Sequence, residues 1–337
     1  MKLKIIVLFV GIVLFAACGN KKTNINDKNI AAELLTLNQK IESSPNDVEL
    51  LNQRANYYIK HNEIDLALND VSKAIKLDST KSELYITLSD VFFAGGKFSN
   101  CRDAISKAIL RDPSDMNAYV KLAELSLYYK DYEETLKNID KALEIDRINP
   151  KAYFIRGFAH MEKGDTTRAI KNFMEATMQD PNYYDAYIEL GLIYAHRHQK
   201  LAVDFYQNAL KARPNSIEAL YNLGMYYQEN NEYDKAIVQY TTLLQFEPKN
   251  KLAPFNIGFI YLEHLSNYPK AVKYFTDAIR SDSTYVDAIY NRGLSYERMK
   301  DMKSARSDYS KALRINSEYE MAIAGMNRLD DKYTKSK

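Results

Sequence analysis

Tyr153-Phe-Ile-Arg-Gly157 followed by Ala169-Ile-Lys-Asn-Phe173 decides the fold, because the same arrangement returns about every 34 residues along the chain. Leu220-Tyr-Asn-Leu-Gly224 with Ala236-Ile-Val-Gln-Tyr240 is a second close copy. A small residue recurs at spacings of 33 to 35 residues, at Ala67, Cys101, Thr135, Ala169, Ala202, Ala236, Ala271 and Ala305. A large apolar side chain follows it four residues later, at Val71, Ile105, Ile139, Phe173, Tyr206, Tyr240, Phe275 and Tyr309. Steps of four share one helical face, so the period predicts eight similar helical units.

The first half of each unit also carries a recurring small residue. It marks the place where two helices must approach closely. It stands at Ala55, Ser89, Ala123, Gly157, Gly191, Gly224, Gly258 and Gly293. Between units the chain turns at short polar residues and prolines such as Asp112-Pro113 and Asp180-Pro181, which end one helix and cap the next. Each unit is therefore predicted to be helix, turn, helix. We place the units at 48–81, 82–115, 116–149, 150–183, 184–216, 217–250, 251–285 and 286–319.

This pattern resembles the tetratricopeptide repeat family over residues 48–319, in both halves of the unit. Thr135 and Cys101 in place of alanine are mild departures, and the extra residue of the seventh unit is expected in the turn 264–269. The Sel1-like family would need a longer unit and a different glycine pattern. The resemblance implies an all-α fold, a right-handed α-solenoid of about eight helix-turn-helix repeats with flanking capping helices.

The two ends of such a solenoid need covers, because each repeat contacts only its neighbours. Residues 30–47 have helical apolar spacing and are predicted to form an N-terminal capping helix. Residues 320–337 carry apolar residues beside a charged face and are predicted to form a C-terminal capping helix and tail.

The chain begins with a basic leader, Met1-Lys-Leu-Lys4, and an apolar run that ends Phe15-Ala-Ala-Cys18. This segment looks like a bacterial lipoprotein signal peptide (1–17) with Cys18 as the lipidated new N-terminus. An ordinary secretory signal and an uncleaved anchor are the alternatives. Polar residues 18–29 are predicted to be a flexible tether. We therefore expect a lipid anchor at the bacterial cell envelope, in the outer rather than the inner membrane, with the solenoid periplasmic or surface-exposed.

Several function classes find no support in the residues. The 46 basic and 44 acidic residues alternate without a basic stripe, which argues against nucleic acid as a partner. There is no phosphate-binding glycine loop, nucleophile elbow or paired-cysteine site, and His196 and His198 diverge on a helix. We expect no enzyme activity, no catalytic residues, no metal and no cofactor. Cys101, at a helix seam, is expected to be a buried small side chain rather than a reactive thiol.

In the tetratricopeptide family, the first helices line a concave groove. The corresponding places are polar in the first repeats, with Asn52, Asn56, Asp90 and Glu124, and apolar later. The predicted apolar lining is Phe154, Phe158, Ile188, Leu192, Tyr221, Met225, Phe255, Phe259, Tyr290 and Leu294. Three amides adjoin it, Asn222, Asn256 and Asn291, and the resemblance implies that they bind the backbone of an extended peptide. An apolar stripe facing water usually serves a partner.

The sequence thus favours a non-enzymatic protein–protein interaction scaffold, a membrane-anchored lipoprotein that binds an extended or helical peptide segment of envelope proteins in its groove. A structural subunit of a secretion or outer-membrane assembly machine, docked outside the groove, is the first alternative. A glycan-binding lipoprotein is less favoured, since the chain lacks Trp and long insertions. A second copy of the chain could also cover the stripe, so a homo-oligomer stays open. The basic residues that clamp chaperone carboxyl termini are not evident in the first repeats.

Overall fold

The computed structural model describes residues 26–335, with side chains for residues 32–330, and within that range the chain is helical without a strand. The first helices of the eight repeats are α2 (Val48–Lys60), α4 (Ser82–Ala94), α6 (Met116–Tyr128), α8 (Pro150–Glu162), α10 (Tyr184–His196), α12 (Ile217–Glu229), α14 (Leu252–Phe259) and α16 (Val286–Arg298). The second helices are α3 (Ile64–Leu77), α5 (Phe98–Arg111), α7 (Tyr132–Ile145), α9 (Thr166–Gln179), α11 (Leu201–Ala212), α13 (Tyr233–Phe246), α15 (Tyr268–Ser281) and α17 (Met302–Ile315). The all-helical repeat fold is confirmed.

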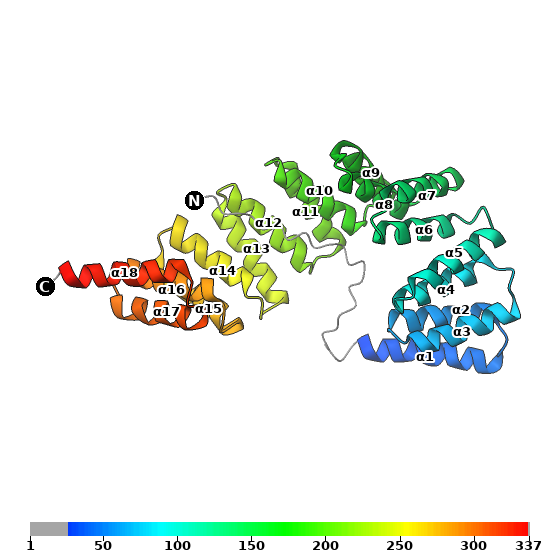
Figure 1. Ribbon diagram of the computed structural model, residues 1–337, viewed down its shortest axis with the longest axis horizontal. Helices are drawn as coiled ribbons and strands as arrows, with labels where there is room; N and C mark the ends of the chain where they lie inside the picture. The colour runs from blue at the N-terminus through cyan, green and yellow to red at the C-terminus, as the bar shows by residue number, and fades with distance from the viewer. Residues whose placement is uncertain (1–25, 336–337) are drawn as a thin grey trace. The chain divides into compact units, whose positions relative to one another are not determined.

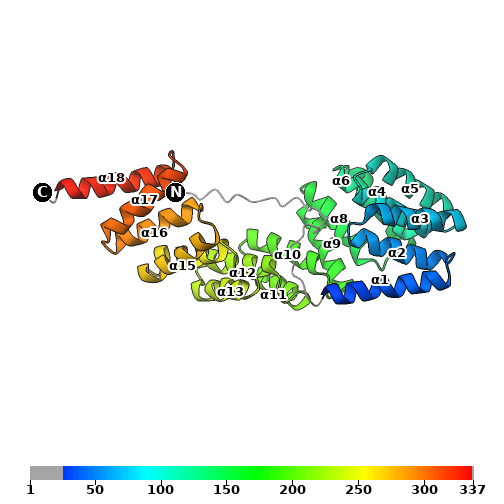
Figure 2. The same ribbon diagram turned by 90° about the horizontal axis from the view of Figure 1, so that it is seen from below.

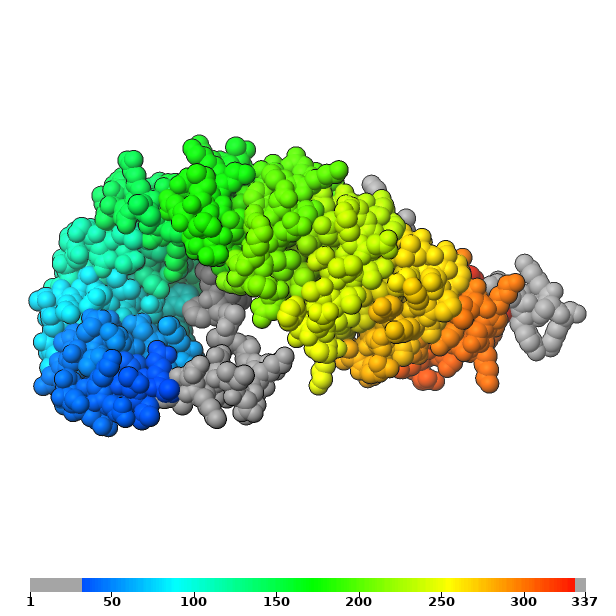
Figure 3. Space-filling model, turned by 180° about the vertical axis from the view of Figure 1, so that it is seen from behind, coloured from blue at the N-terminus to red at the C-terminus, as the bar shows by residue number. Residues whose placement is uncertain are grey.

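The helices form two compact units, with the boundary inside α6 between Leu125 and Ser126. Unit 1 comprises the described residues 26–125, and unit 2 comprises residues 126–335. Within each unit the helices follow one another in space as they do in sequence (Figures 1, 2 and 3). In unit 2, each helix from α7 to α18 packs against the next one along the chain. Each unit is therefore a stack of helical hairpins.

The flanking helices α1 (Asn26–Ser43) and α18 (Glu320–Lys335) cover exposed repeat ends. Leu37 and Ile41 of α1 are buried, and Ile41 joins a cluster with residues of the first repeat. Leu329 of α18 is buried in the cluster of the last repeat. Helix α1 begins at Asn26, so the final residues of the predicted tether 18–29 are helical. The predicted signal peptide 1–17 and Cys18 lie outside the described residues.

Each glycine of the first helices lies directly against an aromatic ring of the second helix. A Cβ atom added at Gly224 would stand 2.7 Å from a ring carbon of Tyr240, and one at Gly258 would stand 2.9 Å from Phe275. In the first two repeats the same place is Ala55 or Ser89, and the side chain opposite is Val71 or Ile105. Glycine is thus required where the second helix carries a ring, because a ring needs the space that a methyl group would occupy.

Gly224→Ala is therefore expected to lower the free energy of unfolding of unit 2 by about 1–3 kcal/mol, because Tyr240 is fully buried and cannot move aside. Urea denaturation followed by circular dichroism measures the loss. The matched control is Gly224→Ala with Tyr240→Ile, which reproduces the small-residue and aliphatic pairing of the second repeat and should recover part of the stability. A double variant no more stable than Gly224→Ala would show that ring contact is not the cause.

The turns inside the repeats share a left-handed residue, whose positive φ reverses the chain after each first helix. It stands at Asn62, Gly96, Lys130, Gly164, His198, Asn231, Ser266 and Lys300. The turns between repeats use short polar side chains as caps. The Asp112 carboxylate accepts hydrogen bonds from the backbone N–H and the hydroxyl of Ser114, at 2.9 and 2.6 Å, and these bonds lower the pKa of Asp112. Polar residues there end one helix and fix the direction of the next, as the sequence predicts.

The extra residue of the seventh repeat is taken up in the helix that leads into the predicted turn 264–269. Helix α14 continues as a π-helical turn, η1 (Ile260–His264), in which the Leu265 N–H donates to the Ile260 carbonyl at 3.0 Å. A π turn inserts one residue while keeping the helix axis. The expectation was therefore incomplete, because a helix can widen locally instead of lengthening its loop.

Three repeats carry an arginine at the seventh position: Arg54, Arg156 and Arg292. Each bonds side chains of two neighbouring helices and so joins three helices. Arg292 donates from Nε and Nη2 to the Asp308 carboxylate at 2.8 and 2.7 Å, and from Nη1 to the Thr276 hydroxyl at 3.2 Å. Arg54 makes the equivalent bonds to Asp70 and to Asn38 of α1. The other repeats carry aliphatic side chains there, Leu88, Leu122, Leu190, Leu223 and Ile257.

Candidate functional site

The predicted lining separates into two rows with different environments. The first row is the fifth position of repeats 4 to 8, namely Phe154, Ile188, Tyr221, Phe255 and Tyr290. Phe154, Phe255 and Tyr290 pack on the second helix and on the following turn. The Phe255 ring, for example, lies 5.7 Å from the Phe275 ring and 5.1 Å from the Tyr285 ring. The Tyr221 ring packs on Tyr240 of the second helix. Phe154, Ile188 and Tyr290 are buried, with 5%, 4% and 8% exposure. These three side chains therefore present little surface to water, and contact between them and a peptide stays a prediction.

The second row is the ninth position of the same five repeats, and it remains accessible. Leu192 is 41% exposed, and the other four side chains are half-buried. We call these five side chains the unit 2 ridge: Phe158, Leu192, Met225, Phe259 and Leu294. In the first two repeats the same position holds Asn56 and Asp90. An apolar row that keeps contact with water over five repeats is the surface in unit 2 best suited to a polypeptide partner.

The three predicted asparagines occupy the sixth position, and the structure does not leave them as a row of free amides. Asn256 is buried, and its amide donates to the Tyr221 hydroxyl at 3.4 Å. Asn291 is buried too, and its amide donates to the Asp287 carbonyl of its own helix at 2.8 Å. Asn222 is half-buried. Binding of a peptide backbone by these residues stays a prediction, and Asn222 is the most accessible of the three.

The sixth position of one repeat lies beside the ninth position of the repeat before it. The Asn56 amide reaches the Thr87 hydroxyl at 3.5 Å, and the Lys121 ammonium reaches the Asp90 carboxylate at 2.6 Å. In unit 2, the Asn256 amide reaches the Met225 sulfur at 3.7 Å. Polar sixth-position side chains are therefore interleaved with the ridge.

Comparison with known proteins gives the repeat its name. Protein-family models described as tetratricopeptide repeat match residues 150–183, 205–238 and 286–319. The first and last of these ranges coincide with repeats assigned from the sequence. This chain is a tetratricopeptide repeat protein. A solved structure of the C-terminal part of a tetratricopeptide repeat-containing protein from Cytophaga hutchinsonii resembles it with a TM-score of 0.63 at 17% identity. That likeness covers 71% of this chain and 98% of the other, and it supports the solenoid fold.

Curated relatives of this tetratricopeptide repeat protein are longer proteins. It is 26% identical over 127 residues to anaphase-promoting complex subunit 3 of Schizosaccharomyces pombe, covering 37% of this chain and 19% of the relative. It is 27% identical over 186 residues to human tetratricopeptide repeat protein 6, covering 54% and 35%. A human protein named as an O-mannosyl-transferase matches at 23% identity over 211 residues, covering 57% and 23%. The chain thus spans about a third or less of these relatives.

One carboxylate beside the ridge of the tetratricopeptide repeat protein escaped sequence reasoning. Glu189 holds the sixth position of the fifth repeat and is half-buried. Burial raises its pKa to about 7, and the nearby carboxylates of Glu218, Asp185 and Glu162 add to the rise. Its identity as a sixth-position residue was available from the register, but its environment depends on contacts between repeats.

Other candidate chemistry in this tetratricopeptide repeat protein has structural explanations. Cys101 is 2% exposed, and burial raises the pKa of its thiol to about 11, as expected for an inert packing residue. Within the described residues, no group of three His, Cys, Asp or Glu side chains is placed to hold a metal ion. No helix among residues 26–335 is both long and apolar enough to cross a bilayer.

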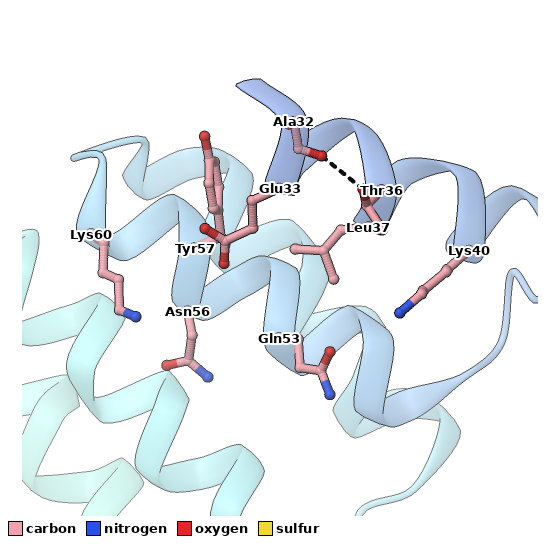
Figure 4. A pocket seen from close by; sticks show the side chains of 9 residues that line it. All are labelled: Ala32, Glu33, Thr36, Leu37, Lys40, Gln53, Asn56, Tyr57 and Lys60. Carbon is pink, nitrogen blue, oxygen red and sulfur yellow. Dashed lines mark hydrogen bonds between the residues drawn. The ribbon is translucent and has the colours of Figure 1, made fainter. Parts of the chain in front are cut away.

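A pocket of about 550 Å³ lies in unit 1 between α1 and α2 (Figure 4). Glu33, Leu37 and Lys40 line it from α1, and Tyr57 and Lys60 from α2. It contains none of the predicted apolar lining residues. Its mixed charges show no preference for one sign of ligand, and the ridge remains the better candidate site.

Proposed function

We propose that this chain is a non-enzymatic scaffold whose unit 2 ridge binds peptide segments of other proteins. The accessible apolar side chains of the ridge are the observation that supports this proposal. Five successive repeats place apolar side chains at the ninth position where water reaches them, although the neighbouring fifth-position residues are used in packing. Burying such a row under a partner would gain about 25 cal/mol for each Å² of apolar area.

The test replaces Phe158, Leu192, Met225 and Phe259 together with asparagine, the residue that the first repeat carries at this position. We expect the variant to keep its helical circular dichroism and to lose the partner proteins that co-purify with the wild-type chain from solubilised envelopes. The control replaces four exposed apolar residues of the second helices, Met178, Val238, Phe246 and Ile315. Loss of partners in the control, with retention in the ridge variant, would refute the proposal.

We further propose that Cys18 carries lipid and holds the scaffold at the bacterial cell envelope. The proposal rests on Phe15-Ala-Ala-Cys18 after a basic and apolar leader. Two or three acyl chains would give stable anchoring. Cells fed an alkynyl fatty acid are expected to label the wild-type protein, and Cys18→Ser should abolish the label. Equal labelling of both proteins would exclude Cys18 as the site.

A second candidate is a structural subunit of an envelope assembly machine that docks through the second helices. Exposed apolar side chains near their ends favour it: Leu110 and Met178 are 73% and 75% exposed. In-cell cross-linking separates the two candidates, because docking of this kind would leave the ridge free of partner contacts.

A further inference from the structure

Charged side chains occupy the sixth position in two repeats, and only one of them has counter-charges within reach. Lys121 of unit 1 pairs with the Asp90 carboxylate at 2.6 Å and with the Glu124 carboxylate at 3.3 Å. Both acids stand at ninth positions, one in the preceding repeat and one in the same repeat. The chain itself thus neutralises a charge at this position.

Glu189 holds the same position in unit 2 without such partners. The ninth positions that correspond to those acids are Phe158 and Leu192, both members of the ridge. Among the described residues, Glu189 makes no hydrogen bond and no ion pair. By this register, the side chains next to Glu189 at the ninth positions are apolar and cannot compensate its charge.

The other carboxylates around Glu189 already have partners. The Tyr184 hydroxyl donates to Glu218 at 2.9 Å, and the Tyr132 hydroxyl donates to Glu162 at 3.0 Å. The Arg213 guanidinium lies 3.6 Å from the Asp185 carboxylate and above the Tyr184 ring. The Arg213 guanidinium is therefore engaged by Asp185 and Tyr184. The surroundings of Glu189 thus keep an excess of negative charge beside an apolar row.

We propose that the partner segment bound on the unit 2 ridge carries an arginine whose guanidinium pairs with Glu189 beside Phe158. This inference rests on the proposed function, and it names the chemistry of the occupant. A guanidinium fits because its planar fork binds a carboxylate through two donors, and its face can lie on an aromatic ring. An occupant without a basic group would bury Glu189 further without compensation. The elevated pKa of Glu189 agrees with a charge that awaits its partner.

The experiment selects binders from a displayed library of random 12-residue peptides on the full chain. The four-asparagine ridge variant serves for counter-selection, so the retained peptides need the ridge. We expect these peptides to be enriched in arginine. Changing the arginine of a selected peptide to citrulline, which keeps the shape and removes the charge, should weaken binding to the wild-type chain at least about tenfold.

Glu189→Gln should weaken binding of the arginine peptide to a similar degree. This variant should also bind the arginine and citrulline forms of the peptide equally well. Glu144→Gln, at an exposed position of α7, is the matched control and should leave both affinities unchanged. Thermal unfolding checks that the variants remain folded. Ridge-dependent peptides without arginine enrichment, bound equally by wild type and Glu189→Gln, would overturn this inference and leave the proposed function standing. A library without any ridge-dependent peptide would overturn both.

Discussion

Replacing Arg292 with leucine is expected to lower the free energy of unfolding of unit 2 by about 3 kcal/mol. Asp308 is 5% exposed, and its carboxylate receives two hydrogen bonds from the guanidinium. Without Arg292, this buried charge loses its counter-ion, and water cannot replace it fully. The loss exceeds that of an exposed ion pair, which contributes about 0–1 kcal/mol.

The matched control is Arg292→Leu with Asp308→Gln, because the sixth repeat carries Leu223 and Gln239 at these two places. The double variant should regain most of the lost stability, since removing both charges leaves none buried without a partner. Amide hydrogen exchange in α16 and α17 measures the local free energy of opening. Equal protection in the single and double variants would contradict the argument.

The stability of unit 2 is expected to fall as pH rises from about 5 to about 8, by up to about 3 kcal/mol through Glu189 alone. Burial raises the pKa of Glu189 in the folded chain from 4.5 to about 7, and three nearby carboxylates contribute to the rise. Between these values the folded chain holds a proton that the unfolded chain has released, so each rise of one pH unit costs about 1.4 kcal/mol. Below pH 4.5 both states are protonated, and the penalty disappears.

Glu189→Gln should be more stable than wild type at pH 8 and nearly equal to it at pH 4.5. Urea denaturation at pH 4.5, 6 and 8 measures the free energy of unfolding of both proteins. Taking the difference between the two values removes the contributions of Asp185, Glu218, Glu162 and Arg213, because both proteins share them. Parallel pH profiles for the two proteins would show that Glu189 is solvated and ionises normally.

The helical hairpins could be predicted from the sequence because their cause is local. Small residues four positions before large ones define a seam, and short polar residues define the turns. The pairing of Gly224 with Tyr240, against Ala55 with Val71, could also have been deduced by comparing repeats. The spacing of the repeat was sufficient for these features.

The candidate site was only half predictable, because burial of a side chain depends on elements distant in sequence. Phe158 and Phe154 share one face of α8, yet Phe154 is covered by Phe173 and Tyr183. The spacing of residues shows which side chains share a helical face, but it does not show how far the following turn covers each of them. Likewise, Glu189 is ordinary in sequence, and its isolation follows from Phe158 in the preceding repeat.

Photo-cross-linking in intact producing cells tests the central claim most directly. A benzoylphenylalanine at Phe259 reports on the ridge, and one at Val238 of α13, which is 57% exposed, reports on a second helix. We predict that position 259 forms adducts with segments of other proteins and that position 238 does not. Adducts at position 238 together with none at position 259 would contradict peptide binding on the ridge.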